Sequence, residues 1–405
     1  MKILFIARIY PNKYSDDGRV IHSQAMELIK KGVEVKVISP LPIVPKFISH
    51  KKSLWRQYRK ITFIEKNESV EVYHPKYVKV PDKITNGFIK KISEFSFINT
   101  ILNTIEKNLK EFDFDVVHIH MTYLDGVVLH KLKRNYDVPV IVSSRRSDFS
   151  KSKDSHRIHK LTKNIYSEAN QIIVPSIPLK NKLKNHFNYT GKYVGNGIYT
   201  KDMDNVTIND KDIDFIDNFV ILSVSNLISL KGIDDNLRAI SLLKKKIPNI
   251  LYLIVGDGPE KKYLRKLADS LDINKNVKFL GGLEHKNAMY YMKRCDVFSL
   301  PSKKETFGLV YLEALYYNKP IILCEEEGIA GSVKHNEEAI LVPKNSPSSI
   351  AKYISKLYLD LNYRKQISIK GNEFVSNSHT WDKIGDELLM EYNKTVLNYN
   401  NSKKN

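Results

Sequence analysis

The sequence predicts an α/β fold with two doubly wound parallel sheets, one in each half of the chain. Short runs of Val, Ile and Leu alternate with amphipathic stretches, which is typical of buried parallel strands connected by helices. The 405 residues exceed the size at which a single core normally stops growing. An Asp- and Asn-rich stretch at 201–218 separates two series of runs. We therefore expect domains at 1–205 and 206–379, with a helix at about 380–400 packing back on the first domain.

The apolar runs place the expected strands. Those of the first half are at 2–7, 34–39, 115–120, 139–144 and 171–176, and those of the second half are at 219–225, 251–256, 277–281, 297–301, 319–324 and 339–343. Helical periodicity follows the last strand at 348–370 and 380–397.

The charge is strongly positive and uneven. Lys and Arg exceed Asp and Glu by 65 to 45, which gives a net charge of +20. Residues 1–200 hold 35 basic and 18 acidic side chains, so most of the excess lies in the first half. Nucleic acid, anionic lipid headgroups or a phosphate-bearing acceptor would each explain it, as would solubility alone. Because no nucleic-acid-binding motif is present, we expect no specific nucleic acid partner.

Neither a targeting segment nor a disulfide framework is evident. The chain has no apolar run of about 18 residues, and its first residues look like a strand rather than a signal peptide. We expect a cytoplasmic protein, and we extend this expectation to a protein that could attach peripherally to the inner face of the cell membrane. Cys295 and Cys324 are interpreted as buried small hydrophobes.

Two segments of the first half depart from the strand and helix rhythm. Residues 46–61 combine Lys and Arg with Phe47, Trp55 and Tyr58, which suits a membrane surface, the cover of an acceptor groove or an ordinary basic surface helix. Residues 87–112 form an amphipathic helix, for which we expect core packing.

The strongest local signal lies at residues 299–324. A buried strand ends at Pro301, a polar loop follows, and a helix begins near Gly308. Such a loop points into the crevice where open α/β sheets bind ligands. The backbone amides expected to face an anion such as a diphosphate are those of Phe307, Gly308, Leu309 and Val310.

Two carboxylates flank this helix start. Glu305 lies in the loop, and Glu313 follows after seven intervening residues. A carboxylate accepts hydrogen bonds from vicinal hydroxyls, so one could hold a sugar ring and the other a ribose. Acid–base catalysis and two solvated glutamates are the alternatives.

The run from Glu305 to Ala314 resembles the family 4 retaining glycosyltransferases of the GT-B fold, whose hallmark is a Glu-x7-Glu motif. The resemblance covers nearly the whole chain and implies two Rossmann-like domains facing a cleft. It implies that Glu305 contacts the donor hexose and Glu313 the ribose. It also implies a nucleotide-diphosphate sugar donor and transfer with retention of anomeric configuration.

Further segments of the second half extend the resemblance. Residues 223–240 are similar to the family's phosphate loop, which makes Lys231 the cation on the diphosphate. Asn226 stands where many relatives carry an arginine. Gly256 belongs to a Gly-x-Gly-Pro turn, and backbone groups from Leu280 through Gly282 would read the base.

The first half supplies the remaining candidates. Gly18 lies in a loop similar to the family's glycine loop, and His120 ends a strand and is expected to point into the cleft. Arg145 occupies the position at which relatives often carry a histidine, and Arg146 replaces the glycine that follows it. Arg145 could contact a sugar hydroxyl or an anionic acceptor. Asn196 opens a turn before the linker.

These residues predict a hexosyltransferase acting on a glycan or lipid-linked acceptor in cell-surface polysaccharide biosynthesis. Lys231, the amides at 307–310 and the helix dipole would absorb the leaving-group charge, so we expect no metal and no cofactor. The Asp-x-Asp patterns at 202–204 and 210–212 lie in the expected linker, away from any strand end. We further expect that the basic first domain could take an anionic membrane surface as a partner. The alternatives are an epimerase or phosphorylase of the same fold, or a basic nucleic-acid-binding protein.

Overall fold

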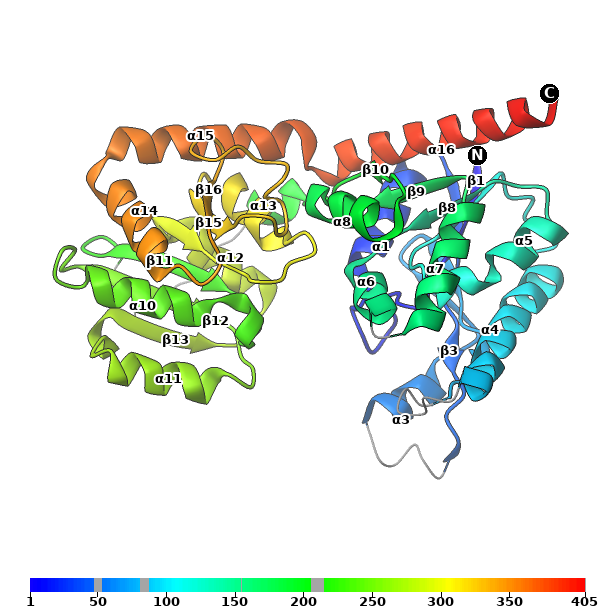
Figure 1. Ribbon diagram of the computed structural model, residues 1–405, viewed down its shortest axis with the longest axis horizontal. Coiled ribbons are helices and arrows are strands. Elements are labelled where there is room, and N and C mark those ends of the chain that lie inside the picture. Colours follow the sequence, from blue (N-terminus) through cyan, green and yellow to red (C-terminus); the bar gives the residue numbers. More distant parts are fainter. Residues whose placement is uncertain (47–52, 81–86, 154, 205–214, 405) are drawn as a thin grey trace. The chain divides into compact units, whose positions relative to one another are not determined.

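The chain forms two compact units. The computed structural model describes residues 1–46, 53–80, 87–153, 155–204 and 215–404. The first unit comprises Met1–Pro175, Leu179–Val194 and Ile384–Asn405, and the second comprises Ser176–Pro178 and Gly195–Lys383 (Figure 1).

The division between Val194 and Gly195 lies earlier than the boundary suggested by composition. Two contacts explain why residues 195–204 join the second unit. Ile198 forms a backbone bridge with Thr380, and the Tyr317 hydroxyl donates to the Met203 carbonyl at 2.6 Å.

The first unit is built on an eight-stranded sheet with the order β10-β9-β8-β7-β1-β2-β5-β4. All neighbours are parallel except β4 and β5. The strands are β1 (Lys2–Ile6), β2 (Glu34–Ile38), β4 (Ile64–Asn67), β5 (Val70–Tyr73), β7 (Val116–Ile119), β8 (Val140–Ser143), β9 (Gln171–Val174) and β10 (Lys192–Tyr193); β3 (Leu41–Pro42) and β6 (Lys76–Tyr77) pair separately. The five strands expected in this half are all present.

Helices accompany this sheet. They are α1 (Arg19–Lys30), α3 (Ser53–Lys60), α4 (Gly87–Asn108), the 3-10 turn η1 (Asp125–Val128), α5 (Leu129–Asn135), α6 (Arg146–Lys153), α7 (His156–Glu168), α8 (Ile177–Phe187, whose first two residues belong to the second unit) and α16 (Trp381–Lys404, which belongs to the first unit from Ile384). The core joins strand residues to one face of α4, where Phe97 and Ile101 are fully buried. Another part of α4 is exposed: Ile92 retains 48% and Phe95 68% of their accessible surface.

The second unit is a six-stranded, wholly parallel sheet with the order β13-β12-β11-β14-β15-β16. Its strands are β11 (Phe219–Val224), β12 (Ile250–Val255), β13 (Val277–Gly281), β14 (Val297–Ser299), β15 (Ile321–Cys324) and β16 (Ile340–Val342); its helices are α9 (Thr200–Asp204), η2 (Ser229–Lys231), α10 (Ile233–Leu243), α11 (Lys261–Ser270), η3 (Asn274–Asn276), α12 (His285–Arg294), α13 (Leu309–Tyr316), α14 (Pro347–Leu359) and α15 (Leu361–Ser378). All six expected strands are present.

Both sheets confirm the predicted fold class, because each has the strand order of a doubly wound Rossmann-like sheet. The order in which the chain adds strands reverses between β11 and β14 in the second sheet, and between β1 and β7 in the first. In such sheets ligands bind outside the carboxyl ends of the strands at this switch point. A ligand site is therefore expected among the residues that follow these four strands.

Candidate active site

An ion pair joins the two loops at the switch point of the second sheet. Lys231 follows β11 and Glu305 follows β14, and the Lys231 Nζ lies 2.6 Å from the Glu305 Oε2. Their side chains retain 20% and 16% of their accessible surface, so the pair is shielded but can be reached. The structure therefore brings together the two residues to which sequence reasoning gave the diphosphate and the sugar.

The loop after β14 leads into helix α13 through a turn that requires glycine. Gly308 has φ +85°, and a Cβ on it would lie 2.4 Å from the Tyr311 ring, so only glycine fits without a shift. The Tyr311 hydroxyl donates to the Leu300 carbonyl at 2.7 Å, which fixes the ring against the strand end. The helix begins at Leu309, so its first amides lie immediately beyond Gly308.

Glu313 lies one turn further along α13. Its carboxylate contacts the His285 Nε2 at 2.8 Å, and its side chain retains 14% of its accessible surface. The His285 side chain is 63% exposed, so water competes for its contact with Glu313. Glu313 thus presents a shielded carboxylate whose partner is largely exposed to solvent.

A third carboxylate, which sequence reasoning missed, supports the Glu305 loop. Glu327 follows β15, is buried, and accepts a hydrogen bond from the Glu305 backbone amide at 2.9 Å. Its other oxygen accepts one from Lys344 Nζ, which follows β16, at 2.7 Å. Four successive strand ends thus place Lys231, Glu305, Glu327 and Lys344 in one chain of contacts. The signal that could have found Glu327 and Lys344 is their position directly after a buried strand.

A buried polar network fixes the strand ends beneath this chain of contacts. The Asn236 amide of α10 donates to the Ser299 carbonyl at 2.9 Å, and the Ser299 hydroxyl returns a hydrogen bond to Asn236 at 2.7 Å. Ser223 of β11 bonds the Tyr252 hydroxyl of β12 at 2.7 Å and donates to the Ser299 carbonyl. Because every bond crosses between elements, the network holds β11, β12, β14 and α10 in register.

The remaining donor-site candidates lie on neighbouring loops. Asn226 is exposed directly after β11. Gly256 packs so closely that an added Cβ would lie 1.8 Å from the Ser225 carbonyl oxygen. Leu280 is half-buried in β13, and Gly282 is exposed, with an added Cβ lying 3.8 Å from the Asp257 Cβ. Their roles toward a nucleotide remain predictions.

At the switch point of the first sheet, an ion pair also joins the two strand ends. Arg8 follows β1 and donates to the Asp125 carboxylate from both its backbone amide, at 2.9 Å, and its Nε, at 3.3 Å. Asp125 is fully buried, and burial raises its pKa while Arg8 lowers it. Gly18 immediately precedes α1 and has φ +88°. A Cβ added to it would lie 2.4 Å from the Ile9 carbonyl oxygen. Sequence reasoning missed the Arg8–Asp125 pair.

His120 is more deeply buried than the sequence suggested. It has no exposed surface, and within the described part of the chain neither ring nitrogen has a hydrogen-bond partner. His118, two residues earlier on β7, bonds the Tyr392 hydroxyl at 2.6 Å and the Ser143 hydroxyl at 2.8 Å. Burial lowers the pKa of His118 to about 3 and that of His120 well below its usual value. Both imidazoles are therefore neutral at pH 7.

Arg145 lies beside His120, directly after β8. Its Nε contacts the His120 carbonyl at 3.5 Å, and its backbone amide donates to Asp148 at 2.8 Å. The Asp148 carboxylate also accepts from the backbone amides of Thr122 and Tyr123, at 3.4 and 3.3 Å. The carboxylate of Asp148 is therefore engaged by main-chain groups rather than by the Arg145 guanidinium.

Other predicted features have separate outcomes. Phe47 and the pattern at 210–212 lie outside the described residues, whereas Trp55 and Tyr58 lie half-buried on α3. Both cysteines are buried and unpaired. Among the described residues, no three His, Cys, Asp or Glu side chains gather as a metal site would require. Within the same described ranges, no helix is both long and apolar enough to cross a membrane.

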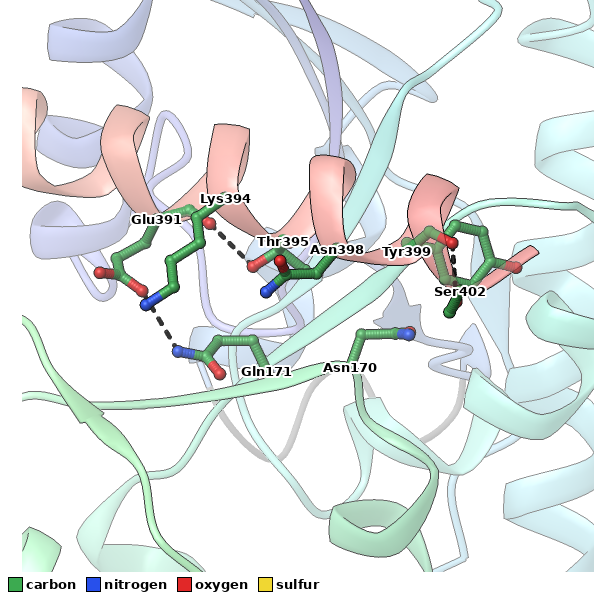
Figure 2. Close-up of a pocket in the computed structure, with 8 residues that line it drawn as sticks. All are labelled: Asn170, Gln171, Glu391, Lys394, Thr395, Asn398, Tyr399 and Ser402. Carbon is green, nitrogen blue, oxygen red and sulfur yellow. Dashed lines mark hydrogen bonds between the residues drawn. The ribbon is translucent and has the colours of Figure 1, made fainter. Parts of the chain in front are cut away.

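A polar cavity of about 170 Å³ lies between α16 and the start of β9 in the first unit. Figure 2 shows Gln171, whose side-chain amide donates to Glu391 at 3.2 Å, below Lys394 and Asn398. Because this cavity lies at the amino end of β9, it is on the edge of the sheet opposite the switch point. It is therefore not part of the candidate active site.

Comparison with known proteins agrees with this geometry. The family model "Glycosyltransferase Family 4" matches residues 18–202, and "Glycosyl transferases group 1" matches residues 207–374. A glycosyltransferase of unknown specificity from Methanocaldococcus jannaschii is 27% identical over 97% of this chain and 98% of its own. The α-monoglucosyldiacylglycerol synthase of Acholeplasma laidlawii is 25% identical over 78% of each chain.

A solved structure shares the fold. Anabaena HepE in complex with UDP superposes with a TM-score of 0.70 at 17% identity, covering 97% of this chain and all of that chain. Two family models thus match successive halves of the chain, and both halves have the Rossmann-like sheets of the GT-B fold. The chain belongs to the group 1 glycosyltransferases, family 4 of the GT-B fold.

Proposed function

We propose that this glycosyltransferase transfers a hexose from a nucleotide-diphosphate sugar with retention of configuration. The observation that carries the proposal is the Lys231–Glu305 pair, which lies at the switch point beside the first turn of α13. A cation, a set of helix-terminal amides and a carboxylate are the groups that a sugar diphosphate needs. The presence of UDP in the HepE complex supports a nucleotide donor for this fold.

Each group has a role in this proposal. Lys231 and the amides at 307–310 bind the diphosphate and stabilise the charge that develops on it as the sugar leaves. Glu305 accepts hydrogen bonds from the hexose, and Glu313 accepts them from the ribose after His285 moves aside. Because these groups together neutralise the leaving group, we propose that no divalent metal is needed.

The acceptor is proposed to be a glycan or lipid-linked glycan of the cell surface. The similarity to a diacylglycerol glucosyltransferase supports a lipid acceptor, and the basic first half of the chain supports an anionic one. The first unit is the proposed acceptor domain. Arg8 at its switch point and Arg145 after β8 are the proposed acceptor-side groups, with the fully buried His120 in contact with Arg145 through its carbonyl.

The test is a calorimetric titration of a nucleoside-diphosphate panel, without metal, against the wild type and Glu313→Ala. We expect saturable binding of one nucleotide and about 10- to 100-fold weaker binding in the variant, because hydrogen bonds to a charged group are lost. Glu373→Ala, an exposed glutamate on α15, is the matched control. If a folded protein binds no nucleotide, the proposal is wrong. The anomeric configuration of the product, read by NMR, tests retention separately.

We also propose that the first unit docks on an anionic membrane. Val78, Ile92 and Phe95 are exposed large apolar side chains, with Lys79 and Lys91 beside them. Two bonds hold the segment after β6 against α4, the Val78 amide to the Ser96 hydroxyl at 2.9 Å and the Val80 amide to the Ser93 hydroxyl at 2.7 Å. Exposed apolar groups next to lysines suit the interface of an anionic bilayer.

Vesicle co-sedimentation tests the membrane proposal. We expect the protein to pellet with vesicles that contain anionic lipid and much less with neutral ones, and Phe95→Ser to reduce pelleting. Leu397→Ser, which removes an exposed apolar side chain from α16, is the control. Equal pelleting with both vesicle types, or none with either, would contradict the proposal.

A further inference from the structure

Lys231 lies on a short turn that the core does not anchor. The turn η2 (Ser229–Lys231) has no buried side chain, and Leu230 retains 40% of its accessible surface. Gly232 follows with φ +67°, and helix α10 begins at the next residue. Because no side chain of η2 is buried, the position of Lys231 depends on the contacts that this segment makes with neighbouring loops.

Lys303, in the loop after β14, contacts the chain on both sides of Lys231. Its backbone amide donates to the Leu230 carbonyl at 2.8 Å. Its Nζ lies 3.4 Å from the Asp234 carboxylate and 3.3 Å from the Asp235 carboxylate, and both aspartates belong to the first turn of α10. Lys303 therefore holds the residue before Lys231 with its main chain, and the helix that follows Lys231 with its side chain.

Lys303 supplies the cation for these two adjacent carboxylates. Within the described ranges, no other basic side chain comes within ion-pair distance of Asp234 or Asp235. Arg238, further along α10, is exposed and acts on Asp235 only from a longer distance. Burial lowers the pKa of Lys303, but the two carboxylates raise it more, so the side chain stays protonated. Removing Lys303 would leave two neighbouring carboxylates without their cation and would loosen the contact between the two loops.

The same two loops are joined in both directions. Lys231 extends from the first loop to Glu305 of the second, and Lys303 extends from the second loop back to the start of α10. The backbones also touch, since a Cβ added to Gly232 would lie 2.3 Å from the Pro301 carbonyl oxygen. A change at Lys303 therefore alters how Lys231 is placed beside Glu305.

We infer that Lys303 is a positioning residue, which holds Lys231 where its ammonium group can bind the donor diphosphate. The inference rests on the proposed function and adds a residue to it. Lys303 needs no contact with the nucleotide in this role, because its ammonium group is already paired with Asp234 and Asp235. Its effect on binding should therefore depend on the presence of Lys231.

A double-mutant cycle tests this dependence. Calorimetry measures affinity for the nucleoside diphosphate that the panel selects, using the wild type, Lys303→Met, Lys231→Met, the double variant and Lys303→Arg. Lys244→Met is the matched control. The Lys244 side chain is 23% exposed, as is that of Lys303, and it pairs with Asp272 at 3.0 Å, but it lies at the other end of α10. Thermal melting of each variant reports folding.

We expect Lys303→Met to weaken diphosphate binding about 3- to 10-fold in the wild-type background, since residues of one salt-bridge network are coupled by amounts of this order. In the Lys231→Met background the same change should cost less than about twofold, because the residue through which Lys303 acts is gone. Lys303→Arg should keep most of the affinity, since a guanidinium also pairs with two carboxylates. Lys244→Met should leave the affinity unchanged.

The outcomes separate this inference from the proposed function. Unchanged affinity in folded Lys303→Met overturns the inference alone, and so do equal losses in both backgrounds, because Lys303 would then act independently of Lys231. Should Lys303→Met not fold, Asp234→Asn breaks one of its contacts by a smaller change and is held to the same two criteria. A wild type that binds no nucleotide, or a Lys231→Met variant that binds as tightly as the wild type, overturns the proposed role of Lys231 and the inference with it.

Discussion

Glu327 offers a sharp test of how the active-site loop is held, because it acts on Glu305 through the backbone. One Glu327 oxygen accepts the Glu305 amide at 2.9 Å, and the other accepts Lys344 at 2.7 Å. Glu327→Ala removes both bonds, whereas Glu327→Gln keeps one oxygen for the amide. Lys344→Met removes only the ion pair, in which the lysine side chain is 36% exposed.

The magnitudes follow from these contacts. A hydrogen bond to a buried charged acceptor contributes about 1.5–3 kcal/mol, which corresponds to about 10- to 100-fold. A partly exposed ion pair contributes about 0.2–1 kcal/mol, or less than about fivefold. We therefore expect Glu327→Ala to have the largest effect, Glu327→Gln an intermediate one and Lys344→Met the smallest.

The assay separates positioning from general damage to the fold. Calorimetry measures affinity for the nucleoside diphosphate and for the complete nucleotide sugar. Because the diphosphate and ribose contact Lys231, the amides at 307–310 and Glu313 in our proposal, affinity for the nucleotide alone should change little. Affinity for the nucleotide sugar and kcat should fall. If folded Glu327→Ala loses both affinities equally, or loses neither, Glu327 does not position Glu305.

Three further predictions concern other parts of the site and the core. Lys231→Met should weaken nucleotide binding about 10- to 100-fold by calorimetry, and Lys231→Arg should recover part of it; unchanged binding would exclude Lys231 from the phosphate site. Gly308→Ala should lower the melting temperature more than Gly32→Ala, since both have positive φ (+85° and +81°) but only the first meets the Tyr311 ring; equal shifts would contradict this. Burial lowers the pKa of His118 to about 3, below its unfolded value near 6.5, so the folded state binds fewer protons between these values. This contribution to the free energy of unfolding is fully present above pH 6.5 and falls as pH drops, by roughly 2 kcal/mol at pH 5. In urea unfolding, His118→Asn should show a free energy that depends less steeply on pH, and an unchanged slope would refute this prediction.

The sequence predicted the strands whose burial produces long apolar runs. It missed the short ones: β3, β6 and β10 have two residues each, which is too few to show a period. It also missed the antiparallel pair β4–β5, in which β4 alternates between exposed and half-buried residues. Periodicity therefore found every strand of the second sheet and, in the first sheet, the five contiguous strands around the switch point.

The candidate site was predictable only in part, because a contact depends on loops that are distant in sequence. Glu325, Glu326 and Glu327 are adjacent and chemically identical, yet the first two are exposed and only the third is buried. The turn after β15 decides which of them faces Glu305. His118 likewise bonds Tyr392, which lies 274 residues further along the chain. The position after a strand narrows the choice to three glutamates, but no local pattern selects Glu327 among them or identifies Tyr392 as the partner of His118.

The two switch points also differ in how their cations can meet a ligand. Lys231 already has a carboxylate partner, but its ammonium group has three donors and can hold Glu305 and a phosphate oxygen together. Donor binding therefore need not break the pair, and Glu305 stays fixed while the diphosphate arrives. Arg8, at the other switch point, pairs with Asp125, whose carboxylate has no exposed surface. A ligand can therefore reach the carboxylate of the first pair but not that of the second, which instead fixes the end of β1 against η1.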